Sequence, residues 1–241
     1  MEYLGIVILP LLLSAIVGYL LGSINWSIIL TRLFKQREDI RKYGSGNAGM
    51  TNVLRTVGKV PAALTFVGDF LKCVAAVLLA WLIMHLTGML FGYRFTFELV
   101  KLGQYIAGVA CVLGHIFPVY YGFKGGKGVV ASAAMIALLD WRVFLLVIGT
   151  FLILFAVKRI VSLASIVCAA LYPVYTFFIV FFFDFAGSPL ASNAGRPLGY
   201  LLYVTAASLF IGGTVLIKHR SNIGRLCRGE EKPVTFGKKK A

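Results

Sequence analysis

Apolar stretches of about 20 residues recur along this chain and restrict what it can fold into. As a helix, each is long enough to cross the roughly 30 Å hydrocarbon core of a bilayer. Hydrophobic residues make up 59% of the chain and charged residues 14%, more apolar surface than a soluble core needs. The sequence therefore predicts an all-α integral membrane protein, with residues 1–241 forming a single polytopic domain.

Hydropathy divides the chain into about seven transmembrane helices, one of them short. The first begins near Tyr3 and has no basic leader, which indicates a retained span rather than a signal peptide. The stretch 128–139 would measure about 18 Å as a helix, so it is either a full crossing or a half-span backed by protein. The expected spans are residues 3–33, 58–86, 99–117, 128–139, 141–157, 163–183 and 198–217.

The Lys and Arg residues predict how the chain is oriented in the membrane. Of the 24 cations, 19 lie in segments 32–59, 117–127, 158–162 and 218–241, which fall on one side if seven spans are counted. Because cytoplasmic loops are enriched in Lys and Arg, we expect the N-terminus outside and the C-terminus in the cytoplasm. Contact with lipid headgroups then accounts for the net charge of +15, and nucleic-acid binding is disfavoured.

Glycine and polar residues alternate between Gly44 and Arg55, after the first span. Glycines expose backbone N–H groups and permit positive φ, and an arginine fork suits bidentate phosphate recognition. The alternative is a turn with an interfacial arginine, but the density of polar residues favours an anion site. No strand precedes the run, so it is not a dinucleotide-binding fingerprint. The candidate ligands are Ser45, Asn47, Gly49, Thr51, Asn52 and Arg55.

A second run, from Gly114 to Gly128, places two lysines among glycines before an apolar segment. Free N–H groups and the positive end of a helix dipole favour an anion there. Nucleotide binding is disfavoured, since Tyr121 stands where a P-loop needs glycine and no Ser or Thr follows Lys127. The alternative is that the lysines only extend to headgroups. The candidate ligands are Lys124, Gly125, Gly126 and Lys127.

Charged residues inside the apolar helices add further candidates. Asp69 and Lys72 lie three positions apart on one helical face, where an ion pair with each other and contact with a substrate both fit. His115 ends an apolar segment and fits either a structural hydrogen bond or catalysis. No metal or other cofactor is expected, because His115 and His219 lack clustered carboxylate or thiolate partners.

Two more polar clusters lie next to the last spans. Ser162 stands near a span start, which suits helix capping as well as substrate binding. Helical spacing puts His219 and Asn222 on one face of a basic segment. That segment is either part of a site or an anchor to lipid headgroups.

Four runs, in this order and spacing, resemble the PlsY family of bacterial membrane acyl-phosphate:glycerol-3-phosphate acyltransferases. They are GSGNAGMTNVLR, GHIFPVYYGFKGGKG, VSLASI and HRSNIGRL. The resemblance implies transfer of a fatty acyl group from acyl phosphate to the 1-hydroxyl of glycerol 3-phosphate, the first acylation of phospholipid synthesis. It implies a multi-pass protein of the bacterial cytoplasmic membrane, with membrane lipids around it and its active site facing the cytoplasm. A monomer is compatible with it.

The resemblance also implies roles for individual residues. The family's catalytic residues correspond here to Ser45, Arg55, Lys127, Ser162 and His219, with Lys124 as the alternative lysine and Asn222 beside the histidine. We hypothesise that the first four neutralise the acyl-phosphate group, a good leaving group that needs no covalent nucleophile. His219 and Asn222 then orient glycerol 3-phosphate. Either His219 or a substrate phosphate accepts the proton.

Two other functions are weighed against this one. Glycerolipid acyltransferases that use acyl-CoA carry an aspartate five positions after a histidine, but here Leu90, Tyr120 and Gly224 occupy those positions. A transporter of phosphate esters would line a pathway with intramembrane cations. Against it, the polar clusters fall on one predicted side, and no repeated half is evident in the sequence.

Overall fold

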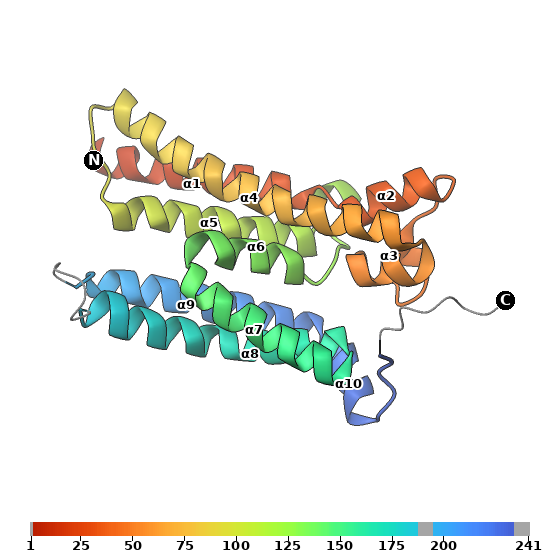
Figure 1. The fold of residues 1–241 in the computed structure, drawn as a ribbon. Helices are drawn as coiled ribbons and strands as arrows, with labels where there is room; N and C mark the ends of the chain where they lie inside the picture. The colour runs from red at the N-terminus through yellow and green to blue at the C-terminus, as the bar shows by residue number, and fades with distance from the viewer. Residues whose placement is uncertain (1, 188–194, 234–241) are drawn as a thin grey trace. The chain divides into compact units, whose positions relative to one another are not determined.

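The computed structural model of the protein describes residues 2–187 and 195–233. Within these ranges all regular structure is helical (Figure 1), which confirms the predicted fold class. The described residues include six helical segments long and apolar enough to cross a membrane, and the shorter apolar helix Val129–Leu139. The six segments are Gly5–Phe34, Lys59–Leu90, Phe97–Tyr121, Trp141–Lys158, Val161–Phe185 and Leu198–Lys218.

The chain divides into two compact units, Met1–Trp141 and Arg142–Ala241, which are described separately. The helices of the first unit are α1 (Glu2–Ser23), α2 (Trp26–Phe34), η1 (Ile40–Lys42), α3 (Met50–Thr56), α4 (Lys59–Leu90), α5 (Phe97–Ile116), η2 (Val119–Tyr121) and α6 (Val129–Leu139). Those of the second unit are α7 (Trp141–Lys158), α8 (Val161–Ile179), the π-helical η3 (Val180–Phe185), α9 (Leu198–Lys218) and α10 (Arg220–Cys227). The single domain stays a prediction.

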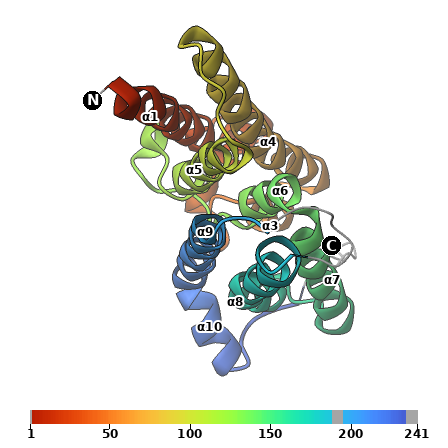
Figure 2. The same ribbon diagram turned by 90° about the vertical axis from the view of Figure 1, so that its left-hand side faces the viewer.

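In the first unit, α1, α4 and α5 pack against one another (Figure 2), with α6 against α4 and α5. The backbones of α1 and α5 come very close. A Cβ atom on Gly18 would overlap the carbonyl oxygen of Ala107, and one on Gly22 would overlap that of Cys111. Small residues are what allow two membrane helices to approach at this distance.

The residues expected to form one span, 3–33, correspond to the candidate span Gly5–Phe34, which is divided into two helices. α1 ends at Ser23, and Asn25 has extended backbone angles (φ −102°, ψ 100°). Its side-chain oxygen accepts a hydrogen bond from the Ile28 N–H at 3.2 Å, which starts α2 with an N-cap. Hydropathy did not detect this break because the residues on both sides of it are apolar.

A small buried core supports the loop end of the first unit. It consists of five fully buried side chains from α2, η1, the first glycine-rich run, α3 and α4. This core fixes the glycine-rich run between helices rather than leaving it as a solvated turn. Its members are Ile28, Ile40, Ala48, Val53 and Ala62.

The second unit is held by contacts among its long helices. The hydroxyl groups of Thr150 on α7 and Tyr175 on α8 lie 2.9 Å apart. Near the start of α7, Arg142 forms an ion pair with Asp184 of η3, with Nη2 and Oδ2 2.7 Å apart. α8 also packs along α9.

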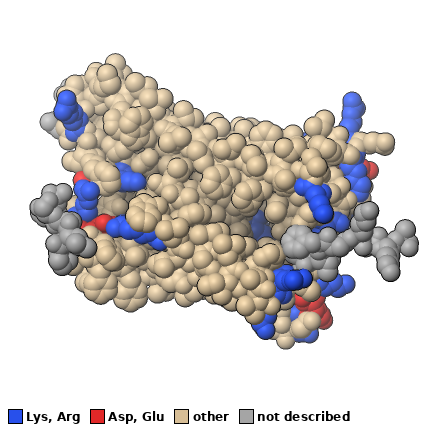
Figure 3. All heavy atoms as spheres, viewed as in Figure 1, with Lys and Arg blue, Asp and Glu red and all other residues tan. Residues whose placement is uncertain are grey.

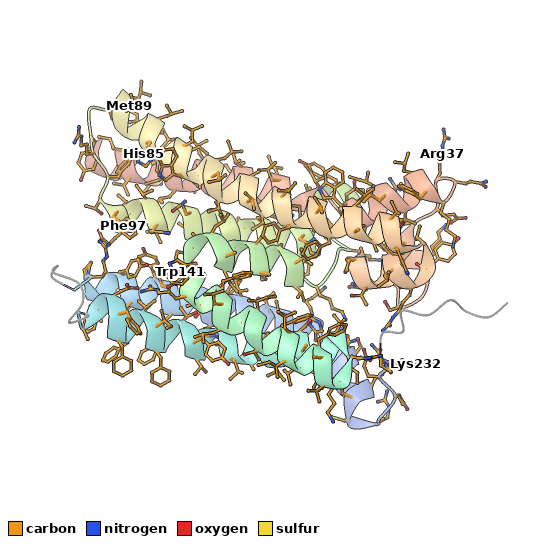
Figure 4. All side chains as sticks on the ribbon, viewed as in Figure 1. Arg37, His85, Met89, Phe97, Trp141 and Lys232 are labelled. Atoms are coloured by element: carbon orange, nitrogen blue, oxygen red, sulfur yellow. The ribbon has the colours of Figure 1, made fainter. Side chains whose placement is uncertain are left out.

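Large apolar side chains cover much of the outer surface of the helices. On the face in Figure 3, most spheres are neither basic nor acidic, and the Lys and Arg side chains gather mainly near the helix ends. In the first unit, Arg37 lies at one end, while Met89 and Phe97 lie toward the other (Figure 4). This pattern fits a lipid-facing surface with polar ends.

Candidate functional site

Asn52 builds the loop formed by the first glycine-rich run. Its buried amide nitrogen donates hydrogen bonds to the backbone carbonyls of Ile40, Tyr43 and Asn47, at 3.3, 2.9 and 3.1 Å. Its side-chain oxygen accepts a hydrogen bond from the Ser45 N–H at 3.1 Å. The structure therefore shows the predicted substrate ligand Asn52 organising the loop that presents Ser45.

The other candidates of this run lie nearer the surface of the first unit. Ser45 and Arg55 are exposed, and Arg55 stands in the last turn of α3. The remaining three are half-buried in the loop or in the first turn of α3. These are Asn47, Gly49 and Thr51.

The second glycine-rich run folds back onto the end of α5. The N–H groups of Gly125 and Gly126 donate to the backbone carbonyls of Ile116 and His115, both at 3.1 Å. A Cβ atom on Gly125 would overlap the His115 carbonyl oxygen, and one on Gly126 would overlap the imidazole Nε2. Glycine is needed here for close approach. Lys127 is half-buried in this run.

Arg41 of η1, just before the first run, contacts the second run, and no pattern in the sequence indicates this contact. Its guanidinium Nη1 donates to the carbonyls of Tyr121 at 2.8 Å and Lys124 at 3.1 Å. Asp39 holds the same guanidinium through its carboxylate, with Nη2 and Oδ2 2.7 Å apart. Burial alone would raise the pKa of Asp39, but the hydrogen bonds and charge of Arg41 outweigh burial and hold that pKa below its ordinary value.

Asp69, Lys72 and His115 come together inside the first unit. Lys72 Nζ lies 2.9 Å from Asp69 Oδ1 and 3.0 Å from His115 Nδ1. All three side chains are buried. The ion pair considered from the sequence is therefore present, and a role in substrate binding stays a prediction.

In the second unit, Ser162 and Asn222 donate to one carboxylate, that of Glu231. The Ser162 hydroxyl and the Asn222 amide both reach Glu231 Oε1 at 2.7 Å. Arg225 Nε donates to Glu231 Oε2 at 2.6 Å. Burial alone would raise the pKa of Glu231, but the hydrogen bonds from Ser162, Arg225 and Asn222 together lower it below its ordinary value.

Neither Glu231 nor Arg225 was singled out from the sequence. The available signal was an acidic pair, Glu230 and Glu231, directly after a basic helix. An acidic residue in such a position indicates a local ion pair. The contact with Ser162, in contrast, spans 69 positions and leaves no local pattern.

His219 lies between α9 and α10 with its ring buried. Its Nδ1 is 2.8 Å from the Val215 carbonyl oxygen, which can only accept a hydrogen bond. We therefore assign the hydrogen of the neutral ring to Nδ1, so that Nε2 is the basic nitrogen. The predicted residues thus fall into two sets, one in each unit.

The chain is similar to known glycerol-3-phosphate acyltransferases over most of its length. A family profile described as Glycerol-3-phosphate acyltransferase matches residues 12–229. Glycerol-3-phosphate acyltransferase of Halorhodospira halophila is 37% identical over 216 residues, covering 90% of this chain and 92% of the relative. That of Paramagnetospirillum magneticum is 39% identical over 232 residues, covering 96% of this chain and 97% of the relative.

Two solved structures are similar in sequence and in fold. Both are crystal structures of PlsY (YgiH), an integral membrane glycerol 3-phosphate acyltransferase. The glycerol 3-phosphate form has a TM-score of 0.69 and 33% identity, covering 93% of this chain and 96% of that chain. The lysophosphatidic acid form has a TM-score of 0.68 and 32% identity, covering 93% of this chain and 95% of that chain. Since the family match covers most of its length, this chain belongs to the glycerol-3-phosphate acyltransferase family.

Proposed function

We propose that this acyltransferase moves a fatty acyl group from acyl phosphate to the 1-hydroxyl of glycerol 3-phosphate. The products are lysophosphatidic acid and inorganic phosphate. The observation that carries the proposal is that the two glycine-rich runs of the first unit lie against each other, Gly126 of the second beside the Ala48 carbonyl of the first. Arg41 contacts the second run from the segment just before the first. Exposed Ser45 and Arg55 and half-buried Lys127 belong to these runs and supply anion-binding groups.

The reaction needs charge neutralisation more than a nucleophile from the protein. The hydroxyl oxygen of glycerol 3-phosphate forms a bond to the carbonyl carbon of acyl phosphate. The bond from that carbon to the phosphate oxygen then breaks, and phosphate leaves with the electron pair. Cations and hydroxyl donors stabilise the charge that develops on the leaving phosphate. Ser45, Arg55, Lys127 and Ser162 have this role, with Lys124 as the alternative lysine.

His219 and Asn222 bind and orient glycerol 3-phosphate. With Nδ1 donating to a carbonyl, His219 Nε2 is the nitrogen that can accept the hydroxyl proton. A phosphate oxygen of the substrate is the other acceptor. The relatives crystallised with glycerol 3-phosphate and with lysophosphatidic acid support this acceptor and this product.

We also propose that the reaction takes place at the cytoplasmic face of a bacterial inner membrane. The support is the distribution of charge, with 19 of 24 cations in segments expected on one side. Acyl phosphate is amphiphilic, so a membrane-embedded enzyme can meet its acyl chain in the bilayer and its phosphate at the interface. A monomer is sufficient for the chemistry described.

The donor can be tested with the purified protein in lipid. It is given glycerol 3-phosphate with either acyl phosphate or acyl-CoA, and lysophosphatidic acid and free phosphate are measured. We expect product from acyl phosphate alone, and strong loss of it in Arg55→Gln but not in the control Lys59→Gln. Product from acyl-CoA alone would refute the donor, and counterflow of glycerol 3-phosphate in proteoliposomes without a donor would favour transport.

A further inference from the structure

A buried lysine stands at the centre of the first unit. Lys72 Nζ donates to the carbonyl oxygens of Gly22 at 2.9 Å and Ile24 at 2.7 Å, and it lies 3.0 Å from His115 Nδ1. These three contacts match the three N–H donors of an ammonium group. Asp69 Oδ1 lies 2.9 Å from the same nitrogen and supplies the compensating charge.

These contacts connect three helices close to the loops. Gly22 and Ile24 flank the end of α1, where helical carbonyl groups lack partners within the helix. His115 stands in the last turn of α5, and Lys72 comes from the interior of α4. A single ammonium group therefore fixes the end of α1 to α4 and to the end of α5.

The far side of His115 faces the glycine-rich runs. Nδ1 of His115 also lies 3.5 Å from Asp69 Oδ1, farther than from Lys72 Nζ. Because an ammonium group cannot accept a hydrogen bond, we assign Nδ1 as the acceptor and place the hydrogen of the neutral ring on Nε2. A Cβ atom on Gly126 would overlap this Nε2 and would also crowd the carbonyl oxygen of Ala48. The imidazole thus lies where the second run meets the first.

In place of the substrate contact expected from the sequence, we propose that Asp69, Lys72 and His115 are positioning residues that hold the two glycine-rich runs in their anion-binding arrangement without contacting the substrate. Buried charges inside a membrane protein are costly, and an apolar pair would fill the same space at lower cost. The cost of burying these charges is explained if Asp69, Lys72 and His115 together set the positions of Gly126 and its neighbour Lys127. This inference rests on the proposed function for the identity of the anion.

Kinetics of single and double variants test this role. Lys72→Met alone leaves the Asp69 carboxylate buried without its lysine, so both thermal stability and activity should fall. The double variant Asp69→Leu, Lys72→Met removes both charges and should recover most of the thermal midpoint. Its KM for acyl phosphate should still be on the order of tenfold higher, while KM for glycerol 3-phosphate stays within about twofold.

A neighbouring residue on α4 provides the matched control. Cys73 is buried beside Lys72, so Cys73→Ala should lower the thermal midpoint and leave KM for acyl phosphate unchanged. If the double variant regains both the midpoint and the wild-type KM, the network has only a structural role and the proposal is overturned.

Hydrogen exchange gives a readout that does not depend on the donor. In the double variant, the amides of residues 44–49 and 122–128 should exchange faster than in the wild type, and inorganic phosphate should protect them less. Unchanged exchange in these segments would overturn the proposal. If the wild type uses only acyl-CoA, the proposed donor fails, and the exchange result alone decides whether the network positions the runs.

Discussion

Gly126 illustrates a residue that is required for its lack of a side chain. Its φ is not in the left-handed region, so the constraint comes from its neighbours His115 and Ala48 rather than from backbone conformation. We expect Gly126→Ala to displace the second run and to lower kcat/KM with acyl phosphate about a hundredfold. The measurement is steady-state transfer by purified protein.

The control for this substitution is Gly213→Ala, the same change in α9. Apart from its chain neighbours and the nearby backbone of α9, no atom of the described residues lies within 4 Å of a Cβ atom placed on Gly213. Alanine in a helix interior is favoured over glycine by about 1 kcal/mol. This variant should keep wild-type kinetics and gain slightly in thermal stability. Equal kinetics for both variants would show that the second run tolerates displacement.

The carboxylate of Glu231 makes the stability of the second unit depend on pH. Its folded pKa lies below the ordinary 4.5, so its contribution is fully present above that value and is lost as pH falls through the lower folded pKa. At neutral pH, Glu231→Gln should destabilise the second unit by about 2 kcal/mol, because charge-assisted hydrogen bonds from three donors are weakened.

The adjacent glutamate gives a matched control for that change. The side chain of Glu230 is 54% exposed, and its partner Arg228 is 61% exposed, so Glu230→Gln should have little effect. Thermal unfolding in detergent from pH 7 to pH 3 measures both variants. The difference in thermal midpoint between Glu231→Gln and the wild type should become smaller as the pH falls. A difference that stays constant would contradict the lowered pKa of Glu231.

At the scale of helices, the close contact of α1 with α5 fixes where the end of α1 lies. Gly22→Ala would place a methyl group against the Cys111 carbonyl oxygen of α5, and overpacking of this kind costs about 1–3 kcal/mol. We expect a lower thermal midpoint for Gly22→Ala and reduced transfer, since Gly22 also accepts a hydrogen bond from Lys72. Among the parts of the chain that the structure describes, and leaving out the nearby backbone of α1 itself, no atom lies within 4 Å of a Cβ atom on Gly5, so Gly5→Ala should resemble the wild type.

Helices and motifs could be predicted from the sequence because they depend on local patterns. Long apolar runs predicted the spans, and glycines between polar residues predicted the two loops. The break at Asn25 was missed, since one capping side chain decides it within an apolar stretch. Arg41 and Glu231 were missed because their partners Lys124 and Ser162 lie 83 and 69 positions away in the chain.

The orientation of the whole molecule can be tested with its own cysteines. Cys73, Cys111 and Cys168 are buried within helices, whereas Cys227 is exposed at the end of α10. A membrane-impermeant maleimide should therefore react with Cys227 and spare the others. If the positive-inside rule orients this chain, labelling should occur in inverted membrane vesicles and not in right-side-out vesicles. Cys227→Ser should abolish it, and labelling of Cys227 from the outer side would contradict the predicted cytoplasmic C-terminus.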